Sequence, residues 1–379
     1  MPATRKPRIV IAGQTPPPFG GQNVTIARKL REFAAEEGCR CEHLAFRFTP
    51  DFKTVRRASA AKALELVKVL ARLFAIRLRG PIDLLLFPAG GPQTVPMVRD
   101  LLLLPWMLLA ARRVVLQFHA AGIADRCGER SMSALCRGVT ALYGRCFGAI
   151  VMTDFNRRDP EFCDIRRIAV IPHRLPDGFD PAMVRRDAAR VRLLYVGHLC
   201  ADKGTPELLR AFKAVAEGDP RLVLELVGET LPPYSDARFR ATIRELGIEG
   251  RVEWPGVLTG RAKQEAFGRA DLFVFPSVAP YESFGLVMIE AMMWGLPIVA
   301  TDWRGNRDVL GSDFEGICFP FGDDLAAALA SALESAIDAR RRHAWSDRNR
   351  RLFLDCYRAR GDRLDYPKLA LRWIAETSR

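Results

Sequence analysis

The chain has 379 residues, of which 49% are hydrophobic and 27% are charged, and its formal net charge is +13 at pH 7. One hydrophobic core rarely serves a chain of this length, so two domains are expected, and the apolar content excludes a disordered chain. Residues 1–150 carry 23 Lys and Arg against 10 Asp and Glu, which, subtracted from totals of 57 and 44, leaves 34 of each kind for residues 151–379. A basic half and a neutral half indicate two domains with different partners.

Nine cysteines are scattered along the chain, and none has the Cys-x-x-Cys spacing of a zinc site. Free thiols in a reducing compartment are therefore expected. The amino end leads directly into an apolar run at residues 9–12 and contains no signal peptide pattern. We expect a cytoplasmic protein that can be peripheral at the inner membrane face. No histidine set has ligand-like spacing, so no metal site is expected.

A glycine-rich turn follows this first run, at residues 13–24. Gly20 and Gly21 remove side-chain bulk just before a predicted helix that Asn23 can cap. Close approach of the backbone to a phosphate or a sugar is the functional interpretation. A purely structural turn is the alternative.

Residues 53–79 are rich in Ala, Leu and Val and predict a long helix. A basic amphipathic helix of this kind is typical of proteins that lie on an anionic membrane. A mostly buried helix with a solvated edge is the alternative, and nucleic acid is not expected because no recognition motif accompanies the charge. The polar stripe of this helix consists of Lys62, Glu65, Lys68, Arg72 and Arg79.

The longest apolar stretch, residues 101–111, is shorter than the roughly 20 residues that span a membrane, and it predicts a buried core helix. The run at residues 114–118 follows it and ends at His119. This histidine is expected to face a ligand site at the end of the strand. A structural histidine is the alternative.

Short apolar runs alternate with helix-length segments along the whole chain, which predicts parallel sheets with right-handed crossovers. The expected fold class is α/β, with two Rossmann-like domains whose parallel sheets face one another across a cleft. The proline-rich segment 172–181 is the expected linker. The expected strands are 9–12, 84–87, 114–118, 150–153 and 168–171 in the first half, and 193–197, 222–228, 272–276 and 298–301 in the second.

Lys203 and Gly204 directly precede a predicted helix, for which Thr205 is a suitable N-cap and Pro206 suits the first turn. Free backbone N–H groups at the start of a helix favour an anion, and a lysine there would neutralise a diphosphate. A surface lysine beside a tight turn is the alternative.

Two carboxylates, Glu282 and Glu290, follow the apolar run 271–276. Glu282 is expected on the loop at the carboxyl end of a strand, and Glu290 about two turns into a helix at residues 284–294. Open α/β sheets bind ligands at such loops. Two ordinary surface carboxylates are the alternative.

These segments together resemble a family 4 glycosyltransferase of the GT-B fold, the group 1 type. Residues 275–301, which read Phe-Pro-Ser-Val-Ala-Pro-Tyr-Glu-Ser-Phe-Gly-Leu-Val-Met-Ile-Glu-Ala-Met-Met-Trp-Gly-Leu-Pro-Ile-Val-Ala-Thr, carry most of the resemblance. Val196-Gly-His-Leu199 and Asp202-Lys-Gly204 are similar to the family's diphosphate segment. Leu226-Val-Gly228 is similar to the end of its next strand.

The resemblance implies a retaining, metal-independent glycosyltransferase without a cofactor. It would move a sugar from a nucleoside-diphosphate sugar to a hydroxyl of a glycan or lipid-linked acceptor, in cell-surface polysaccharide or glycolipid synthesis. It assigns residues 1–175 to an acceptor-binding domain, which can face an anionic membrane surface. Residues 190–360 would form the nucleotide-sugar-binding domain, and a helix in 361–379 can cross back to the first domain. A sugar-nucleotide epimerase and a non-catalytic nucleotide-sugar binding protein are the alternatives.

The resemblance also implies roles for single residues. Glu282 would contact hydroxyls of the donor sugar, Lys203 the diphosphate, and His119 would lie near the reacting sugar. Two departures from the family pattern stand out: His198 replaces a common arginine, and His173-Arg174 replaces a common Asn-Gly, which implies altered linker geometry. The implied donor-binding residues are Gly20, Gly21, His198, Gly228, Val257, Phe284, Gly285, Leu286 and Glu290.

Overall fold

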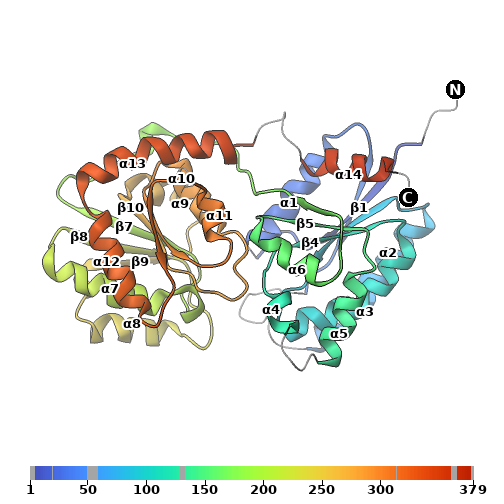
Figure 1. Cartoon of the computed structure of the whole chain (residues 1–379), viewed down its shortest axis with the longest axis horizontal. Coiled ribbons are helices and arrows are strands. Elements are labelled where there is room, and N and C mark those ends of the chain that lie inside the picture. The colour runs from blue at the N-terminus through green and yellow to red at the C-terminus, as the bar shows by residue number, and fades with distance from the viewer. Residues whose placement is uncertain are drawn as a thin grey trace. The chain divides into compact units, whose positions relative to one another are not determined.

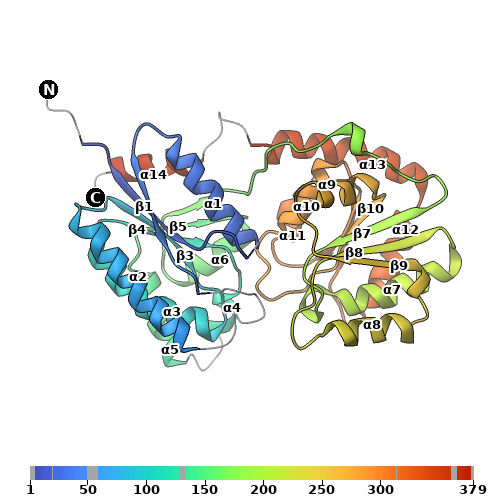
Figure 2. The same ribbon diagram turned by 180° about the vertical axis from the view of Figure 1, so that it is seen from behind.

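The computed structural model of the chain describes residues 5–18, 20–48, 59–128, 133–312, 314–359 and 365–376. The chain divides into two compact units (Figure 1). Unit 1 comprises Met1–Pro172 and Gly361–Arg379, and unit 2 comprises His173–Arg360. In each unit, helices cover both faces of a parallel sheet (Figures 1 and 2).

The described residues of unit 1 form a six-stranded parallel sheet in the order β2-β1-β3-β4-β5-β6. Strands covered by helices on both faces read as continuous apolar runs, and β1, β3 and β4 are buried along their whole length. The strands are β1 (Arg8–Gly13), β2 (Arg40–Ala45), β3 (Leu84–Ala89), β4 (Val114–Phe118), β5 (Gly148–Val151) and β6 (Ile168–Val170).

Helices α2, α3 and α5 pack side by side on one face of this sheet, and α1 packs with α14 on the other face (Figures 1 and 2). The C-terminal helix α14 thus belongs to unit 1, where the ring centroids of Trp373 and Phe147 are 6.0 Å apart. The helices are α1 (Gly21–Ala34), α2 (Ala60–Leu78), α3 (Thr94–Ala110), α4 (Ile123–Cys127), α5 (Ala134–Tyr143), α6 (Arg158–Phe162) and α14 (Tyr366–Ala375), with a 3-10 turn at Phe155–Arg157.

In the part of unit 2 that the structure describes, a second six-stranded parallel sheet has the order β12-β11-β10-β7-β8-β9. The central strands β7, β10 and β11 are again mostly buried, which places their carboxyl ends beside one another in the middle of the sheet. The strands are β7 (Val191–Val196), β8 (Leu222–Val227), β9 (Val252–Gly256), β10 (Leu272–Phe275), β11 (Ile298–Asp302) and β12 (Gly316–Pro320).

Helices α7, α8 and α12 form one hydrophobic core with this sheet, and α9, α10 and α13 lie on the opposite face (Figure 1). The helices are α7 (Thr205–Gly218), α8 (Asp236–Glu245), α9 (Gly260–Arg269), α10 (Leu286–Met293), α11 (Asn306–Leu310), α12 (Leu325–Ala336) and α13 (Ala339–Leu352). Short 3-10 turns lie at Pro181–Met183, Ala201–Lys203 and Glu249–Arg251, and a π-helical turn at Phe353–Tyr357.

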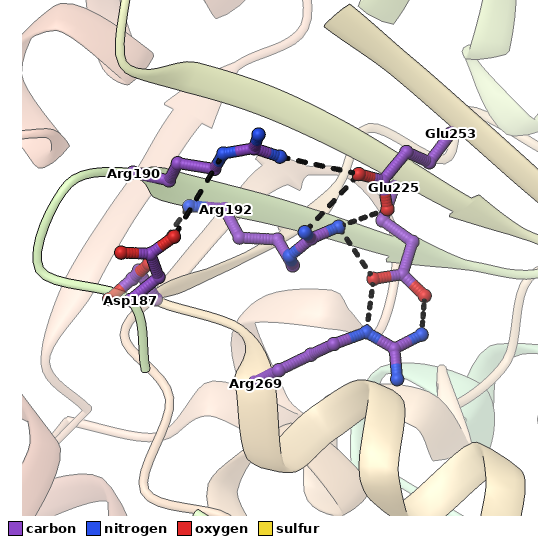
Figure 3. A network of polar contacts seen from close by, with 7 residues as sticks. Asp187, Arg190, Arg192, Glu225, Glu253 and Arg269 are labelled. Atoms are coloured by element: carbon purple, nitrogen blue, oxygen red, sulfur yellow. Dashed lines mark hydrogen bonds and ion pairs between the residues drawn. The ribbon is translucent and has the colours of Figure 1, made fainter. Parts of the chain in front are cut away.

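A network of ion pairs ties the end of α9 to three neighbouring strands (Figure 3). Glu225 on β8 is fully buried, and its Oε2 accepts from Arg269 Nε at 2.9 Å and from Arg192 Nη1 at 3.2 Å. Arg269 also binds the other oxygen of Glu225, and Arg192 also pairs with Glu253 on β9. We call this set the Glu225 network. It fixes the position of α9 because Arg269 is the last residue of that helix.

Three edge strands, β2, β9 and β12, were not expected from the sequence. Most residues of these strands are exposed or only partly buried, so none of the three has the continuous buried run of an interior strand. The helix expected at residues 53–79 begins at Ala60, and residues 53–58 lie outside the described residues. The expected helix at 101–111 is the second half of α3 and is not wholly buried, since one side of it faces solvent. None of the described helices has the length and apolar content to cross a membrane.

Candidate functional site

Lys203 and Glu282 meet in unit 2 at the carboxyl ends of two neighbouring strands. Lys203 lies in the short 3-10 turn between β7 and α7, and Glu282 lies in the loop between β10 and α10. Lys203 Nζ donates to Glu282 Oε2 at 2.6 Å, and the two side chains are only 15% and 10% exposed. The structure thus joins two residues that are 79 positions apart in the sequence.

Glu282 is held as a carboxylate by the groups around it. Burial alone would raise its pKa, but the charge of Lys203 and hydrogen bonds from Lys203, the Ser277 hydroxyl and the Gly285 amide lower the pKa below its ordinary value. Ser277 Oγ donates to the carboxylate at 2.8 Å. Glu282 is therefore ionised at neutral pH, with a second oxygen that can accept from a ligand hydroxyl.

Lys203 is held as a cation by the same pair. Burial would lower its pKa, yet the negative charge of Glu282, the neighbouring Tyr281 and the hydrogen bond to Glu282 raise the pKa above its ordinary value. The ammonium group also lies 5.6 Å from the centroid of the Tyr281 ring. Both charges of the pair thus persist across the physiological pH range.

Two glycines in the left-handed region allow the loops to bring this pair together. Gly204 has φ +68°, and a Cβ there would lie 2.2 Å from the carbonyl oxygen of Pro276, at the end of β10. Gly285 has φ +61°, and a Cβ there would lie 2.7 Å from Met288 Cε. Only glycine fits these conformations without strain, and each one is the N-cap of a helix, α7 or α10.

Two expectations about helix caps are wrong for the same reason. Thr205 does not cap α7: the cap is Gly204, and the Thr205 hydroxyl donates to the carbonyl of Cys200 at 3.1 Å. Asn23 does not cap α1, because that helix already begins at Gly21, and the Asn23 side chain donates to the carbonyl of Pro18 at 2.8 Å. A glycine cap has no side chain, so it cannot accept a hydrogen bond from the first backbone amides of its helix.

Glu290 makes a separate ion pair that the sequence did not suggest. It lies just over one turn into α10, nearer to its start than expected, and both of its oxygens accept from Lys263 Nζ, at 2.8 and 2.7 Å. Lys263 comes from the first turns of α9, which the Glu225 network fixes to the sheet. The side chains are 26% and 18% exposed, so the pair is half-buried. Lys263 belongs to no motif, and only the packing of α9 beside α10 reveals it.

His198, Gly228 and Val257 lie at the ends of three adjacent strands, β7, β8 and β9. Burial and the charge of Lys203 lower the pKa of His198 to about 4, so its ring is neutral at pH 7. The indole of Trp254 donates to the carbonyl of Gly228 at 2.8 Å, and Val257 is 60% exposed. These residues form a rim that continues from the Lys203–Glu282 pair along the edge of the sheet.

The residues that open α10 contribute backbone more than side chain. The ring of Phe284 is buried and lies 4.9 Å from the ring of His173 and 6.1 Å from that of Tyr357. It therefore packs the loop onto the segment that enters unit 2. Leu286 is the first residue of α10 and follows the Gly285 cap.

In unit 1, Gly20 and Gly21 begin α1, with Gly20 as the N-cap. A Cβ on Gly21 would meet no described atom within 4 Å, so packing does not require glycine at this position. Gly20 and Gly21 follow the carboxyl end of β1, an interior strand of the unit 1 sheet.

His119 follows β4 in unit 1 and lies beside a buried lysine that the sequence analysis missed. Lys29 on α1 is fully buried, bonds to the side-chain oxygen of Gln117, and has its Nζ 3.4 Å from His119 Nε2 and 4.1 Å from the centroid of the Tyr366 ring. Burial, and then the charge of Arg28, lower the pKa of Lys29 well below its ordinary value. The ammonium group of Lys29 thus contacts the Nε2 atom of the His119 ring. Its position in an amphipathic helix gave no sequence signal.

Among the described residues, no group of three or more His, Cys, Asp or Glu side chains is placed to hold a metal ion. Two lysine–glutamate pairs, Lys203–Glu282 and Lys263–Glu290, lie in the described loops and first helical turns of unit 2. Such an arrangement can hold an anion against Lys203 and the first amides of α7 and α10, and can accept hydrogen bonds from ligand hydroxyls at Glu282 and Glu290.

Part of this chain is similar in sequence to known glycosyltransferases. Residues 182–352 match the family model of group 1 glycosyl transferases. An uncharacterized glycosyltransferase of Methanocaldococcus jannaschii is 31% identical over 137 residues, which cover 36% of this chain and 33% of that protein. Mannosylfructose-phosphate synthase of Agrobacterium fabrum is 31% identical over 147 residues, which cover 34% of this chain and 32% of that protein. The chain thus matches about a third of the length of these curated relatives.

Two solved structures share the fold over nearly the whole chain. Sucrose-phosphate synthase from Thermosynechococcus elongatus superposes with a TM-score of 0.72 at 18% identity, covering 97% of both chains. HepE of Anabaena superposes with a TM-score of 0.64 at 17% identity, covering 93% of this chain and 95% of that one. The chain therefore has the GT-B fold, and residues 182–352 of unit 2 are similar to the group 1 glycosyl transferases.

Proposed function

We propose that this chain is a retaining glycosyltransferase that moves a sugar from a nucleoside-diphosphate sugar to a hydroxyl of a glycan or lipid-linked acceptor, in the synthesis of cell-surface polysaccharide or glycolipid. The observation that carries the proposal is the buried Lys203–Glu282 pair at the ends of two parallel strands, directly before two glycine-capped helices. A persistent cation, a persistent carboxylate and open helix amides are what a sugar diphosphate requires.

In the proposed reaction, the bond between the anomeric carbon and the diphosphate oxygen breaks, and its electron pair leaves with the diphosphate. The acceptor oxygen forms the new bond on the same face of the sugar, and its proton passes to the leaving phosphate oxygen. Charge builds up on that phosphate in the transition state, and fixed donors already aimed at it stabilise the charge. Lys203 and the first amides of α7 and α10 would serve as those donors, so the reaction would need no metal ion.

The other candidate site residues of unit 2 would bind the donor. Glu282 would accept hydrogen bonds from hydroxyls of the transferred sugar, and Glu290 from the ribose, with Lys263 holding the Glu290 carboxylate in place. The backbone near Gly228 and Val257 would flank the base, and Phe284, Gly285 and Leu286 would lend amides. The neutral ring of His198 would make the diphosphate depend more on Lys203 than in relatives with arginine at this position.

We assign acceptor binding to unit 1, with His119 near the reacting sugar and Gly20–Gly21 as a close backbone approach. Lys29 would fix the ring of His119 through its contact with Nε2. This unit carries the basic half of the chain, which suits an anionic or lipid-linked acceptor at the cytoplasmic face of a membrane. HepE, which shares the fold, has been crystallised with UDP and glucose, and this supports uridine nucleotides as the first donors to try.

A thermal-shift screen against UDP-, GDP- and ADP-sugars tests the proposal first, because a ligand that binds the folded state raises the melting temperature. The effective donor is then incubated with and without candidate acceptors, and products are analysed. Transfer that depends on an acceptor supports the proposal. Conversion of the donor sugar without an acceptor would instead identify an epimerase, and stabilisation without any turnover would identify a binding protein.

A further inference from the structure

Helices α2 and α3 of unit 1 expose an unusual number of large apolar side chains. Among the described residues, thirteen large hydrophobic side chains are exposed, and eight of them belong to these two helices. Single exposed apolar residues are normal on proteins, but a contiguous group marks an interaction site. The eight, which we call the α2–α3 apolar face, are Leu64, Val67, Phe74 and Leu78 on α2, and Val98, Leu102, Trp106 and Leu109 on α3.

The eight residues lie on one continuous surface. On each helix they recur at intervals of three, four or seven residues, which keeps them on one side of the helix. The opposite sides of the helices hold Val69, Leu73 and Met97, which are fully buried against the sheet. The two helices pack side by side (Figures 1 and 2), and the rings of Phe74 and Trp106 meet edge-to-face at 5.8 Å. The outward sides therefore join into a single apolar face.

The charges around this face are almost all positive. Residues 60–79 contain five basic residues and one acidic residue, a balance of +4. The acidic residue, Glu65, pairs with Arg72 at 3.0 Å. On α3, Asp100 is fully buried and pairs with Arg99. Lys68, Arg77 and Arg79 are exposed on α2, and Arg112 is exposed just after α3.

We propose that the α2–α3 apolar face docks onto an anionic lipid bilayer, with its aromatic and aliphatic side chains in the headgroup region and its cations on the lipid phosphates. Two observations carry the proposal: an apolar face of two adjacent helices that no described part of the chain covers, and a border of cations without exposed carboxylates on the same helices. Interfacial helices have this combination of leucines, aromatic rings and bordering Lys and Arg.

A second copy of the chain fits this face less well. Symmetric pairing of two α2–α3 faces would bring two sets of bordering cations together, and like charges oppose each other across an interface. Anionic lipid headgroups neutralise these cations, at about 1 kcal/mol for each Lys or Arg near the surface. The charge border therefore favours a bilayer.

The test is flotation of the full chain with vesicles of phosphatidylcholine that contain phosphatidylglycerol, compared with vesicles of phosphatidylcholine alone. Leu78→Ser/Leu109→Ser removes the two most exposed members, at 87% and 79%, and should leave folding intact. We expect this variant to bind the anionic vesicles at least about tenfold more weakly. Phe321→Ser, at a side chain that is 50% exposed in unit 2, is the matched control and should bind like the wild type.

The charge border is tested with Lys68→Gln/Arg77→Gln, which should weaken binding roughly twenty-five-fold, at about fivefold for each cation. Arg238→Gln/Arg261→Gln removes two exposed cations from unit 2 and should change binding little. Equal binding to both vesicle types, no binding at all, or a concentration-dependent dimer that Leu78→Ser/Leu109→Ser breaks would each overturn the proposal. Donor binding measured in solution should be the same in all four variants, so this test stands or fails separately from the proposed function.

Discussion

Unit 2 contains two sets of buried or half-buried ion pairs that differ in what surrounds them. The Glu225 network lies on a face of the sheet, where one fully buried carboxylate is bound by two arginines (Figure 3). The Lys203–Glu282 and Lys263–Glu290 pairs lie at the carboxyl ends of strands, where each glutamate has a single lysine and the side chains keep some exposure. Lysine or arginine paired with glutamate therefore occurs in unit 2 both where the carboxylate is fully buried and where it keeps some exposure to solvent.

The difference indicates separate roles. In the Glu225 network, the partners satisfy one another and hold α9 to three strands, so a ligand has nothing to replace. In the two lysine–glutamate pairs, each carboxylate has only one cationic partner, and all four side chains keep some exposure to solvent. Loss of a member of the first set should therefore cost stability, whereas loss of a member of the second should cost function.

The largest effect is expected for Glu225→Ala. This substitution leaves Arg192 and Arg269 without their buried counter-charge, and breaking a buried pair in this way costs about 3–5 kcal/mol of unfolding free energy. Urea denaturation measures the loss. Glu253→Ala is the control, since the Glu253 side chain is 46% exposed and should contribute less than about 1 kcal/mol. Equal losses in the two variants would show that the network is not what anchors α9.

Lys203→Ala should reduce turnover by about 10²–10³, equivalent to about 2.7–4 kcal/mol, because a fixed donor to the leaving diphosphate is lost. The unfolding free energy should fall far less than turnover does. Initial rates of sugar transfer provide the measurement, and Lys213→Ala, in the middle of α7, is the matched control. Near-normal transfer by Lys203→Ala would remove this residue from the proposed site.

Glu290→Ala should raise the donor dissociation constant at least about tenfold, since a charged hydrogen bond contributes about 1.5–3 kcal/mol. Calorimetric titration with the donor found in the thermal-shift screen measures the change. Glu265→Ala removes a carboxylate from an exposed pair on α9 and should leave the dissociation constant unchanged. An unaltered constant for Glu290→Ala would contradict the ribose assignment.

The smallest effect is expected for the loss of stability at acidic pH. The pKa of His198 is about 4 in the folded chain, against an ordinary value of 6.5. The unfolded chain therefore binds this proton first as the pH falls, so the contribution of His198 to stability is full above about pH 6.5 and is lost progressively down to about pH 4. His198→Gln should lessen the loss by up to about 1 kcal/mol per pH unit. Urea titrations at pH 7 and pH 5 would refute this if both proteins lost the same stability.

Most of the interior of the fold could be predicted from the sequence, but three of its four edge strands could not. The interior strands, such as β3 and β10, are continuous apolar runs because helices cover both of their faces. The missed strands β2, β9 and β12 are all at sheet edges, where solvent reaches part of each strand and the apolar run is interrupted. Likewise, the apolar stretch at residues 101–111 of α3 indicated burial, yet three of its large side chains are exposed.

The candidate site was predictable where it depends on local sequence. Lys203 and Glu282 follow apolar runs and precede helices, so their positions at strand ends could be inferred. Lys263 and Lys29 could not, because each meets its partner only through the packing of one helix on another element. The helix caps were also missed, since a glycine cap, extended at Gly20 and left-handed at Gly204, leaves no side-chain signal to compete with a nearby Thr or Asn.

The most direct test of the separate roles of these ion pairs is a thermal-shift comparison of wild type, Lys203→Ala and Glu225→Ala with the same nucleotide-sugar panel. We expect Glu225→Ala to melt at a lower temperature but to gain as many degrees from the effective donor as the wild type does. Lys203→Ala should lose fewer degrees than Glu225→Ala, because Glu282 keeps its hydrogen bonds from Ser277 and the Gly285 amide, and it should gain little or nothing from the donor. A full donor-induced rise in Lys203→Ala, or its loss in Glu225→Ala alone, would contradict the account.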